Sequence, residues 1–203
     1  MPRIPAPERR SALVHAALRV VAERGVAAAT TRAIVAEAGM SLASFHYAFS
    51  SRDELMAELI RYVVSQEEVA ILGGGVWQDL PVGGTIRDYV YTGLRGYVDL
   101  LRRDPLREKA MFELTQYALR SPGMTFLAQE QYDHYFALAA TALEHAADLT
   151  GCQWDRPTED VARLLVALTD GLTIAWLVNK DDTAAISIIE FAADAVAGMA
   201  RTA

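Results

Sequence analysis

The segment from Ser41 to Phe49 places polar side chains beside small and apolar ones at helical spacing. Phe45 and Phe49 are four residues apart, so they share one face of a helix, which we expect to pack inward. The outward positions hold Leu42, Ala43, Ser44, His46 and Tyr47. Hydroxyl and imidazole groups hydrogen-bond to base edges and phosphates, whereas Leu and Ala fit the methyl group of thymine. The outward face is therefore a candidate surface for contact with DNA.

A second short helix must precede this segment to hold it in place. Thr30 and Thr31 are suited to begin a helix that runs to Ala38, and Gly39 is suited to the left-handed turn that ends it. Two short helices joined by such a turn form a helix-turn-helix, whose second helix enters the major groove of DNA. The alternative is a helical hairpin inside an ordinary α-helical bundle.

This segment resembles the TetR family of transcriptional regulators. In that family a Thr-Thr/Val-x-x-Ile-Ala-x-x-Ala-Gly-Val-Ser segment precedes a recognition helix that ends Tyr-x-His-Phe, followed by Lys-x-x-Leu. Residues 30–41 of this chain read TTRAIVAEAGMS, and the resemblance covers about residues 10–60. It implies an all-α fold of about nine helices, with a three-helix DNA-binding domain over residues 1–50. A long fourth helix then joins this domain to a helical ligand-binding and dimerisation domain over residues 51–203.

The family's DNA contacts transfer to this chain position by position. By resemblance, Thr31 contacts a phosphate, and Arg32 reaches a base edge or a phosphate. The positions nearest the bases are Leu42, Ala43 and Ser44. Two of these three side chains are apolar, so polar discrimination between bases falls to Arg32, Ser44 and either His46 or Tyr47.

The chain departs from the family pattern at the end of the recognition helix. It has His46-Tyr47-Ala48-Phe49 where the family has Tyr-x-His-Phe, so His46 takes the place of the Tyr and Ala48 removes the contact of the His. Arg52 replaces the Lys and keeps a positive charge at the start of the next helix, where backbone N–H groups also favour an anion. We expect Tyr47 and Arg52 to contact phosphates.

Helical periodicity continues over the rest of the chain. Ser51 to Glu54 has the Ser-x-x-Glu spacing of a capping box, which begins a fourth helix that the glycines at 73–75 end. Later helices are expected at roughly 84–103, 106–120, 124–150, 158–179 and 183–201. No segment favours a β-strand.

Aromatic residues gather in the C-terminal part, where side chains between helices could line an apolar ligand site with a few polar groups. The predicted ligand contacts are Tyr89, Phe112, Gln116, Tyr117, His134, Trp176 and Asn179. The alternative is that the aromatic residues only form the core. No dense cluster of Arg is present to demand a phosphate or polyacid, so we expect a small, largely apolar effector.

The last two helices carry apolar residues across more than one face. The Asp170-Gly171-Leu172 step inside the first of them resembles the dimer bundle of the family. We therefore expect a homodimer that reads a palindromic operator in double-stranded DNA, because two-fold symmetric proteins recognise two-fold symmetric sites. The alternative is that both helices close the core of the monomer.

Charge and composition limit the function classes. The net charge is −7, and residues 1–60 hold seven Arg against six acidic residues, so any contact with DNA must be local. Arg3, Arg9 and Arg10 lie in a leader interrupted by prolines, either a basic arm on phosphates or a solvated tail. The single cysteine, Cys152, excludes an internal disulfide. Without an uninterrupted apolar stretch of about 20 residues, we expect no membrane contact and a cytoplasmic location.

An all-α enzyme is the least favoured alternative. Carboxylate-bridged metal bundles need Glu-x-x-His pairs, and the sequence has none. It also lacks a nucleophile elbow, a P-loop and a dinucleotide fingerprint, so we expect no catalytic residue, no cofactor and no metal. The favoured function is a repressor released from its operator by an effector. The other alternative is an all-α ligand-binding or adaptor protein without DNA activity.

Overall fold

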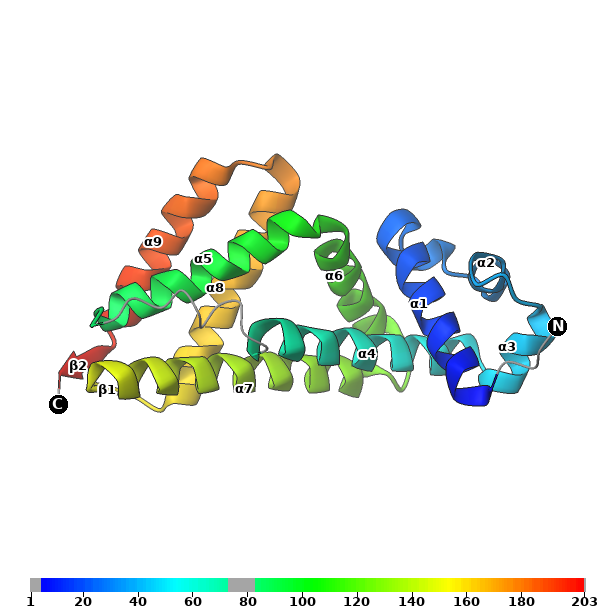
Figure 1. Cartoon of the computed structure of the whole chain (residues 1–203), viewed down its shortest axis with the longest axis horizontal. Coiled ribbons are helices and arrows are strands. Elements are labelled where there is room, and N and C mark those ends of the chain that lie inside the picture. Colours follow the sequence, from blue (N-terminus) through cyan, green and yellow to red (C-terminus); the bar gives the residue numbers. More distant parts are fainter. Residues whose placement is uncertain (1–4, 73–82, 203) are drawn as a thin grey trace. The chain divides into compact units, whose positions relative to one another are not determined.

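The computed structural model describes residues 5–72 and 83–202, which are almost entirely helical (Figure 1). The elements in chain order are α1 (Ala6–Arg24), the 3-10 turn η1 (Val26–Ala28), α2 (Thr31–Glu37), α3 (Leu42–Ala48), α4 (Arg52–Leu72), α5 (Ile86–Arg103), α6 (Pro105–Arg120), α7 (Thr125–Thr150), β1 (Cys152–Trp154), α8 (Thr158–Asn179), α9 (Asp182–Ala197) and β2 (Ala200–Thr202). The predicted all-α class is confirmed. The glycines at 73–75 and Arg3 lie outside the described residues.

The chain forms two compact units that do not follow its sequence order. Unit 1 comprises Met1–Gln66 and Leu106–Gln131, and unit 2 comprises Glu67–Pro105 and Tyr132–Ala203. Most of α6 and the start of α7 therefore pack with the N-terminal helices. The domain boundary predicted at residue 50 remains a prediction. The packing shows that most of α6 and the start of α7 belong to the same unit as the helix-turn-helix.

The core of unit 1 is built from the inward faces of α1 to α4. Leu13, Ile34, Phe45, Phe49 and Leu59 are each at most 1% exposed. Burial of one such side chain contributes about 1.5–3 kcal/mol. The spacing of Phe45 and Phe49 thus predicted the buried side of α3 correctly, and the opposite side faces outward.

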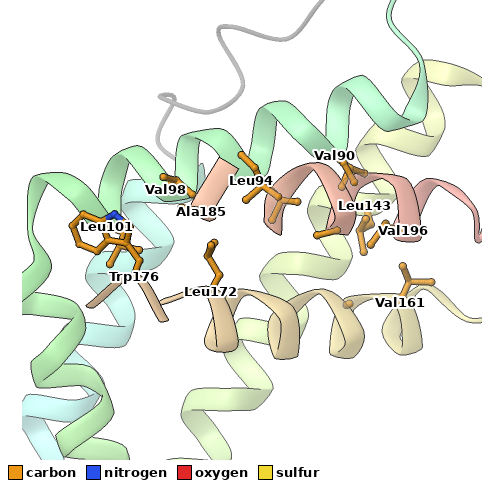
Figure 2. Packing of buried hydrophobic residues seen from close by; sticks show 14 residues of the cluster. Val90, Leu94, Val98, Leu101, Leu143, Val161, Leu172, Trp176, Ala185 and Val196 are labelled. Carbon is orange, nitrogen blue, oxygen red and sulfur yellow. The ribbon is translucent and has the colours of Figure 1, made fainter. Parts of the chain in front are cut away.

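The core of unit 2 lies between α5, α8 and α9. Figure 2 shows Val90, Leu94 and Val98 on α5 facing apolar side chains of the other two helices. A complete capping box begins α5: the backbone N–H of Asp88 donates to the Thr85 hydroxyl, and the backbone N–H of Thr85 donates to the Asp88 carboxylate at 2.8 Å. Unit 2 therefore has its own core and its own helix-start signals.

A two-stranded antiparallel sheet differs from the expectation of no strand. β1 pairs with β2 so that Cys152 lies opposite Thr202, and Trp154 lies opposite Ala200. The final helix ends at Ala197, earlier than the predicted 201. Three-residue strands are too short to show an alternating pattern, which is why periodicity missed them.

Candidate nucleic-acid interface

The helix-turn-helix is fixed by a polar cap on each of its two helices. The Thr30 hydroxyl accepts the backbone N–H of Ala33 at 3.2 Å, and the Ser41 hydroxyl accepts the N–H of Ser44 at 3.2 Å. Gly39 adopts φ +63°, a left-handed conformation that L side chains rarely take. These local signals set the angle at which α3 leaves α2.

The outward side of α3 carries the predicted DNA contacts. Tyr47 is 81% exposed and Leu42 is 42% exposed, and Ala43 and His46 are exposed as well. Ser44 is half-buried, with its hydroxyl 3.0 Å from that of Ser41. α3 therefore presents a mixed apolar and polar surface, and the hydroxyl of Ser41 already orients that of Ser44.

The start of α2 presents a second group of outward donors. Arg32 is exposed in the first turn, and Thr31 beside it is half-buried. The first N–H groups of a helix lack partners within the helix and favour an anion. The predicted phosphate and base contacts of α2 are thus placed at its positive end.

Arg52 braces the connection between α1 and α2. Its Nε donates to the carbonyl of Ala29 at 2.7 Å, and its Nη2 donates to the carbonyl of Val26 at 2.8 Å. Its Nη1 donates to the Tyr117 hydroxyl at 3.0 Å, and this hydroxyl donates to Asp53 at 2.6 Å. Burial, followed by the hydrogen bond to Asp53, raises the pKa of Tyr117. The resemblance predicted a phosphate contact for Arg52, and nothing in the sequence indicated this bracing role.

Arg10 belongs to the folded unit, so the expectation that it lies in a flexible leader is wrong. α1 begins at Ala6, with Pro7 in its first turn, where proline is tolerated. The Arg10 guanidinium donates to the Ala48 carbonyl and to the carboxylates of Glu54 and Glu58. Its charge is therefore already paired within unit 1.

Three of the predicted ligand contacts lie on α6 in unit 1. Phe112 is half-buried, Gln116 is exposed, and Tyr117 bonds to Arg52 and Asp53 as described above. The structure therefore gives Tyr117 a role beside the helix-turn-helix, and the ligand role of these three residues remains a prediction.

The other four predicted ligand contacts lie in unit 2, each in its own surroundings. Tyr89 is buried in an apolar cluster, and His134 is half-buried. The indole N–H of Trp176 donates to Asp182 at 2.9 Å, and the exposed Asn179 accepts the backbone N–H of Asp181. Their ligand role also remains a prediction.

Sequence reasoning assigned no ligand role to one polar pair in unit 2. The Tyr132 hydroxyl on α7 donates to the Asp170 carboxylate on α8 at 2.8 Å. A single acidic residue inside the long apolar run of α8 is the sequence signal that could have identified it.

Both the N-terminal and the C-terminal part of the chain match models of known protein families. Residues 13–59 match the family model described as bacterial regulatory proteins, tetR family, and residues 87–201 match the BetI-type transcriptional repressor C-terminal model. The transcriptional regulator PksA of Bacillus subtilis is 41% identical over 182 residues, which cover 86% of this chain and 83% of PksA.

Two further relatives are named for the small molecules they respond to or hold. The nicotine-responsive repressor HdnoR of Paenarthrobacter nicotinovorans is 29% identical, with 89% of each chain covered. The structure of the multidrug binding protein EbrR complexed with imidazole has a TM-score of 0.69 and 26% identity, with 97% of each chain covered.

Regulators of this family bind DNA and small-molecule effectors and act as dimers. The two family models and the similarity to PksA both indicate a transcriptional regulator, and the exposed side of α3 is consistent with a recognition helix. The chain belongs to the TetR family and is a ligand-responsive, DNA-binding transcriptional regulator rather than an enzyme.

Proposed function

We propose that this protein is a cytoplasmic repressor that binds a palindromic operator as a homodimer and leaves it when a small molecule with a largely apolar body binds unit 2. The observation that carries the DNA part is the exposed side of α3, where an 81% exposed Tyr47 stands beside exposed small and apolar side chains. A large aromatic side chain left in water on a capped recognition helix is suited to lie against a DNA backbone.

The proposed contacts divide into positioning and readout. Thr31 and Tyr47 hold phosphates, which positions the protein without specifying a sequence. Arg32 and Ser44 read base edges, and His46 takes over the phosphate contact of the family's Tyr. Arg52 makes three hydrogen bonds within unit 1, and since a guanidinium has five N–H groups, it can also hold a phosphate at the start of α4.

The base-contacting side chains on α3 also include two apolar ones. Leu42 and Ala43 are both exposed. Such side chains favour thymine through its methyl group, so we expect an operator half-site with thymine at the positions they face.

The outward sides of α8 and α9 support the homodimer. On α8, Leu164, Gly171, Ile174 and Val178 are exposed at steps of three, four and seven residues, which form one stripe. On α9, Phe191 is 64% exposed. Apolar stripes of this kind mark interaction surfaces, and a second copy of the same pair of helices would cover both.

α8 has the length and apolar composition of a membrane-spanning helix, the single such helix in the part of the chain that the structure describes. In this proposal the apolar side chains of α8 serve the protein core and the dimer rather than a membrane. One side packs in the core of unit 2, and the exposed stripe meets the second copy rather than lipid.

Selection from a random pool of double-stranded DNA with the full chain tests the function. The expected result is an enriched palindrome. Binding to it should weaken as salt increases, because phosphate contacts release counterions. Failure to enrich any sequence at low salt with the effector-free dimer would contradict the proposal and favour an α-helical ligand-binding protein without DNA activity.

Variants then separate the proposed roles. Tyr47→Ala should weaken binding to all sequences alike and leave the salt dependence unchanged, because a neutral hydroxyl releases no counterion. Arg32→Ala and Ser44→Ala should instead relax preference at particular base pairs by about 1–3 kcal/mol. Arg120→Ala, which removes one exposed charge from α6, is the matched control and should leave affinity nearly unchanged. Fluorescence anisotropy with the operator and with single-base variants measures both effects, and uniform loss in all three α2–α3 variants would contradict the division.

A further inference from the structure

The recognition helix α3 carries no permanent positive charge. Over residues 42–48 it reads LASFHYA, so its one basic residue is His46. Contact between a positive group and a phosphate releases counterions from DNA, which is the main source of affinity for the backbone. A neutral imidazole can donate a hydrogen bond to a phosphate and releases no counterion. The charge state of His46 therefore sets how strongly α3 holds the DNA backbone.

The imidazole of His46 is placed to receive a phosphate. Its side chain is exposed, and among the described residues no hydrogen bond or ion pair occupies its ring nitrogens. Its ring stands edge-to-face against that of the buried Phe45, with centroids 5.6 Å apart and planes at 86°. The core residue thus orients the imidazole from one side and leaves both ring nitrogens for an external partner.

The end of α3 does not oppose a positive charge on this imidazole. His46 lies in the last turn of the helix, where the helix dipole favours a cation. At the same end, Arg10 of α1 donates to the Ala48 carbonyl and pairs with the carboxylates of Glu54 and Glu58 of α4. This cluster holds one cation and two carboxylates, so its net charge favours a further proton.

The permanent cations around the helix-turn-helix are largely engaged within unit 1. Arg19 of α1 pairs with Glu37 of α2 at 2.7 Å, and Arg52 donates three hydrogen bonds within the unit. Arg32 remains exposed at the start of α2, where its charge opposes protonation of His46 in the free protein. Phosphates of bound DNA reverse this balance, because they are anions beside both side chains.

We propose that His46 binds its phosphate as an imidazolium, so that each recognition helix takes up a proton when the protein binds its operator. Histidine is the side chain whose charge ordinarily changes between about pH 5 and 8. A phosphate stabilises the protonated form, so by linkage the complex tightens as the pH falls. This proton uptake rests on the proposed function and gives the regulator a response to pH in addition to its response to a small molecule.

Operator affinity of the full chain at several pH values and constant ionic strength tests this uptake. Fluorescence anisotropy should show binding about tenfold tighter at pH 6 than at pH 8, because a dimer takes up two protons. The factor should be the same for operators with single-base changes, since a phosphate contact carries no sequence information. The slope of log affinity against log salt should be steeper at pH 6 by about 0.9 for each recognition helix.

Proton uptake can also be counted directly. Isothermal titration of operator into protein at pH 7, in two buffers with different heats of ionisation, gives the number of protons bound with the DNA. We expect a positive number that disappears when the imidazole is replaced.

Substitutions at position 46 assign the proton. His46→Gln should lose the pH dependence and bind at every pH as weakly as the unchanged protein does at pH 8. His46→Arg has a permanent charge, so it should bind at pH 8 about as tightly as the unchanged protein at pH 6, a gain that misfolding cannot produce. His145→Gln, at an exposed histidine on α7, is the matched control and should keep the full pH dependence.

Three results would overturn the proton uptake while leaving the operator in place. The first is equal affinity at pH 6 and pH 8. The second is a pH dependence that survives in His46→Gln, which would assign the proton to another group such as His15, whose ring packs 4.9 Å from that of Tyr62. The third is a pH dependence confined to one base-pair change, which would make His46 a base contact. Absence of DNA binding at both pH values would instead contradict the proposed function, and the proton uptake with it.

Discussion

Glu54 connects the start of α4 to α1 and to the end of the recognition helix. Its carboxylate accepts the backbone N–H of Ser50 at 2.7 Å and the Ser50 hydroxyl at 2.6 Å, and it pairs with Arg10 at 3.0 Å. The Ser50 hydroxyl, the Ser50 N–H and Arg10 together lower the pKa of Glu54 to about 2. One residue therefore fixes the loop that joins α3 to α4.

This lowered pKa makes the stability of the protein depend on pH. Ionised Glu54 stabilises the folded state above its ordinary pKa of 4.5, and this contribution is lost as the pH falls from 4.5 towards 2. Because 39% of the side chain is exposed, we expect Glu54→Gln to lower the free energy of unfolding at pH 7 by only about 1 kcal/mol. Urea unfolding at pH 7 and pH 3 checks this, and an equal loss at both values would contradict it.

Asp170 should act in the opposite direction. Its pKa is raised by burial, so the ionised group opposes folding, and stability falls as the pH rises from its ordinary pKa of 3.8 through the raised value. Asp170→Asn should therefore raise the melting temperature at pH 7 and raise it less at pH 4. Differential scanning calorimetry measures both. A marked fall at pH 7 would indicate that the carboxylate is structurally required.

At the scale of elements, α6 supports the turn between α1 and α2. The Glu113 carboxylate accepts the backbone N–H of Val26 at 2.6 Å, and Arg52 holds the Val26 carbonyl from α4. Gly25 just before it has φ +82°, and a Cβ there would lie 3.0 Å from a Glu113 oxygen. The backbone N–H and the carbonyl of Val26, the first residue of η1, are thus both held by side chains of other helices.

Removal of this support should loosen the turn. Glu113→Ala should lower the free energy of unfolding by about 1–2 kcal/mol, because the Val26 N–H loses a charged acceptor. Hydrogen exchange at residues 26–29 should become faster, and affinity for all DNA sequences should fall alike. Lys109→Ala, at an exposed residue of the same helix, is the control. Unchanged exchange would show that Arg52 alone holds the turn.

The sequence predicted the elements better than their partners. Thr30, Ser41 and Gly39 act locally, so the caps and the turn of the helix-turn-helix could be located from residue types alone. The roles of Arg52 and Tyr117 could not, because they depend on the packing of α6 beside α4 in unit 1. An amphipathic pattern shows that a helix has a buried side and does not show which helices cover it.

At the scale of the whole molecule, the proposed operator requires two recognition helices, and one copy of the chain contains one. The described surface offers a place for the second copy on α8 and α9, where Ile174 is 46% exposed and Phe191 is 64% exposed. Each is apolar and lies outside the core that Figure 2 shows. Dimerisation and DNA binding should therefore be linked by concentration, since a monomer reads only half of a palindrome.

A charge placed in this surface should separate the two copies without unfolding either. Phe191→Asp should convert the dimer into a monomer in sedimentation velocity at micromolar concentration, with the helical circular dichroism retained, because the side chain is exposed in the single chain. Its operator affinity should then fall by more than tenfold, while binding to a single half-site stays the same. Leu149→Asp, at a 50% exposed apolar residue on α7, is the matched control and should remain dimeric. A dimer that survives Phe191→Asp and the corresponding Ile174→Asp would mean that the second copy contacts another surface.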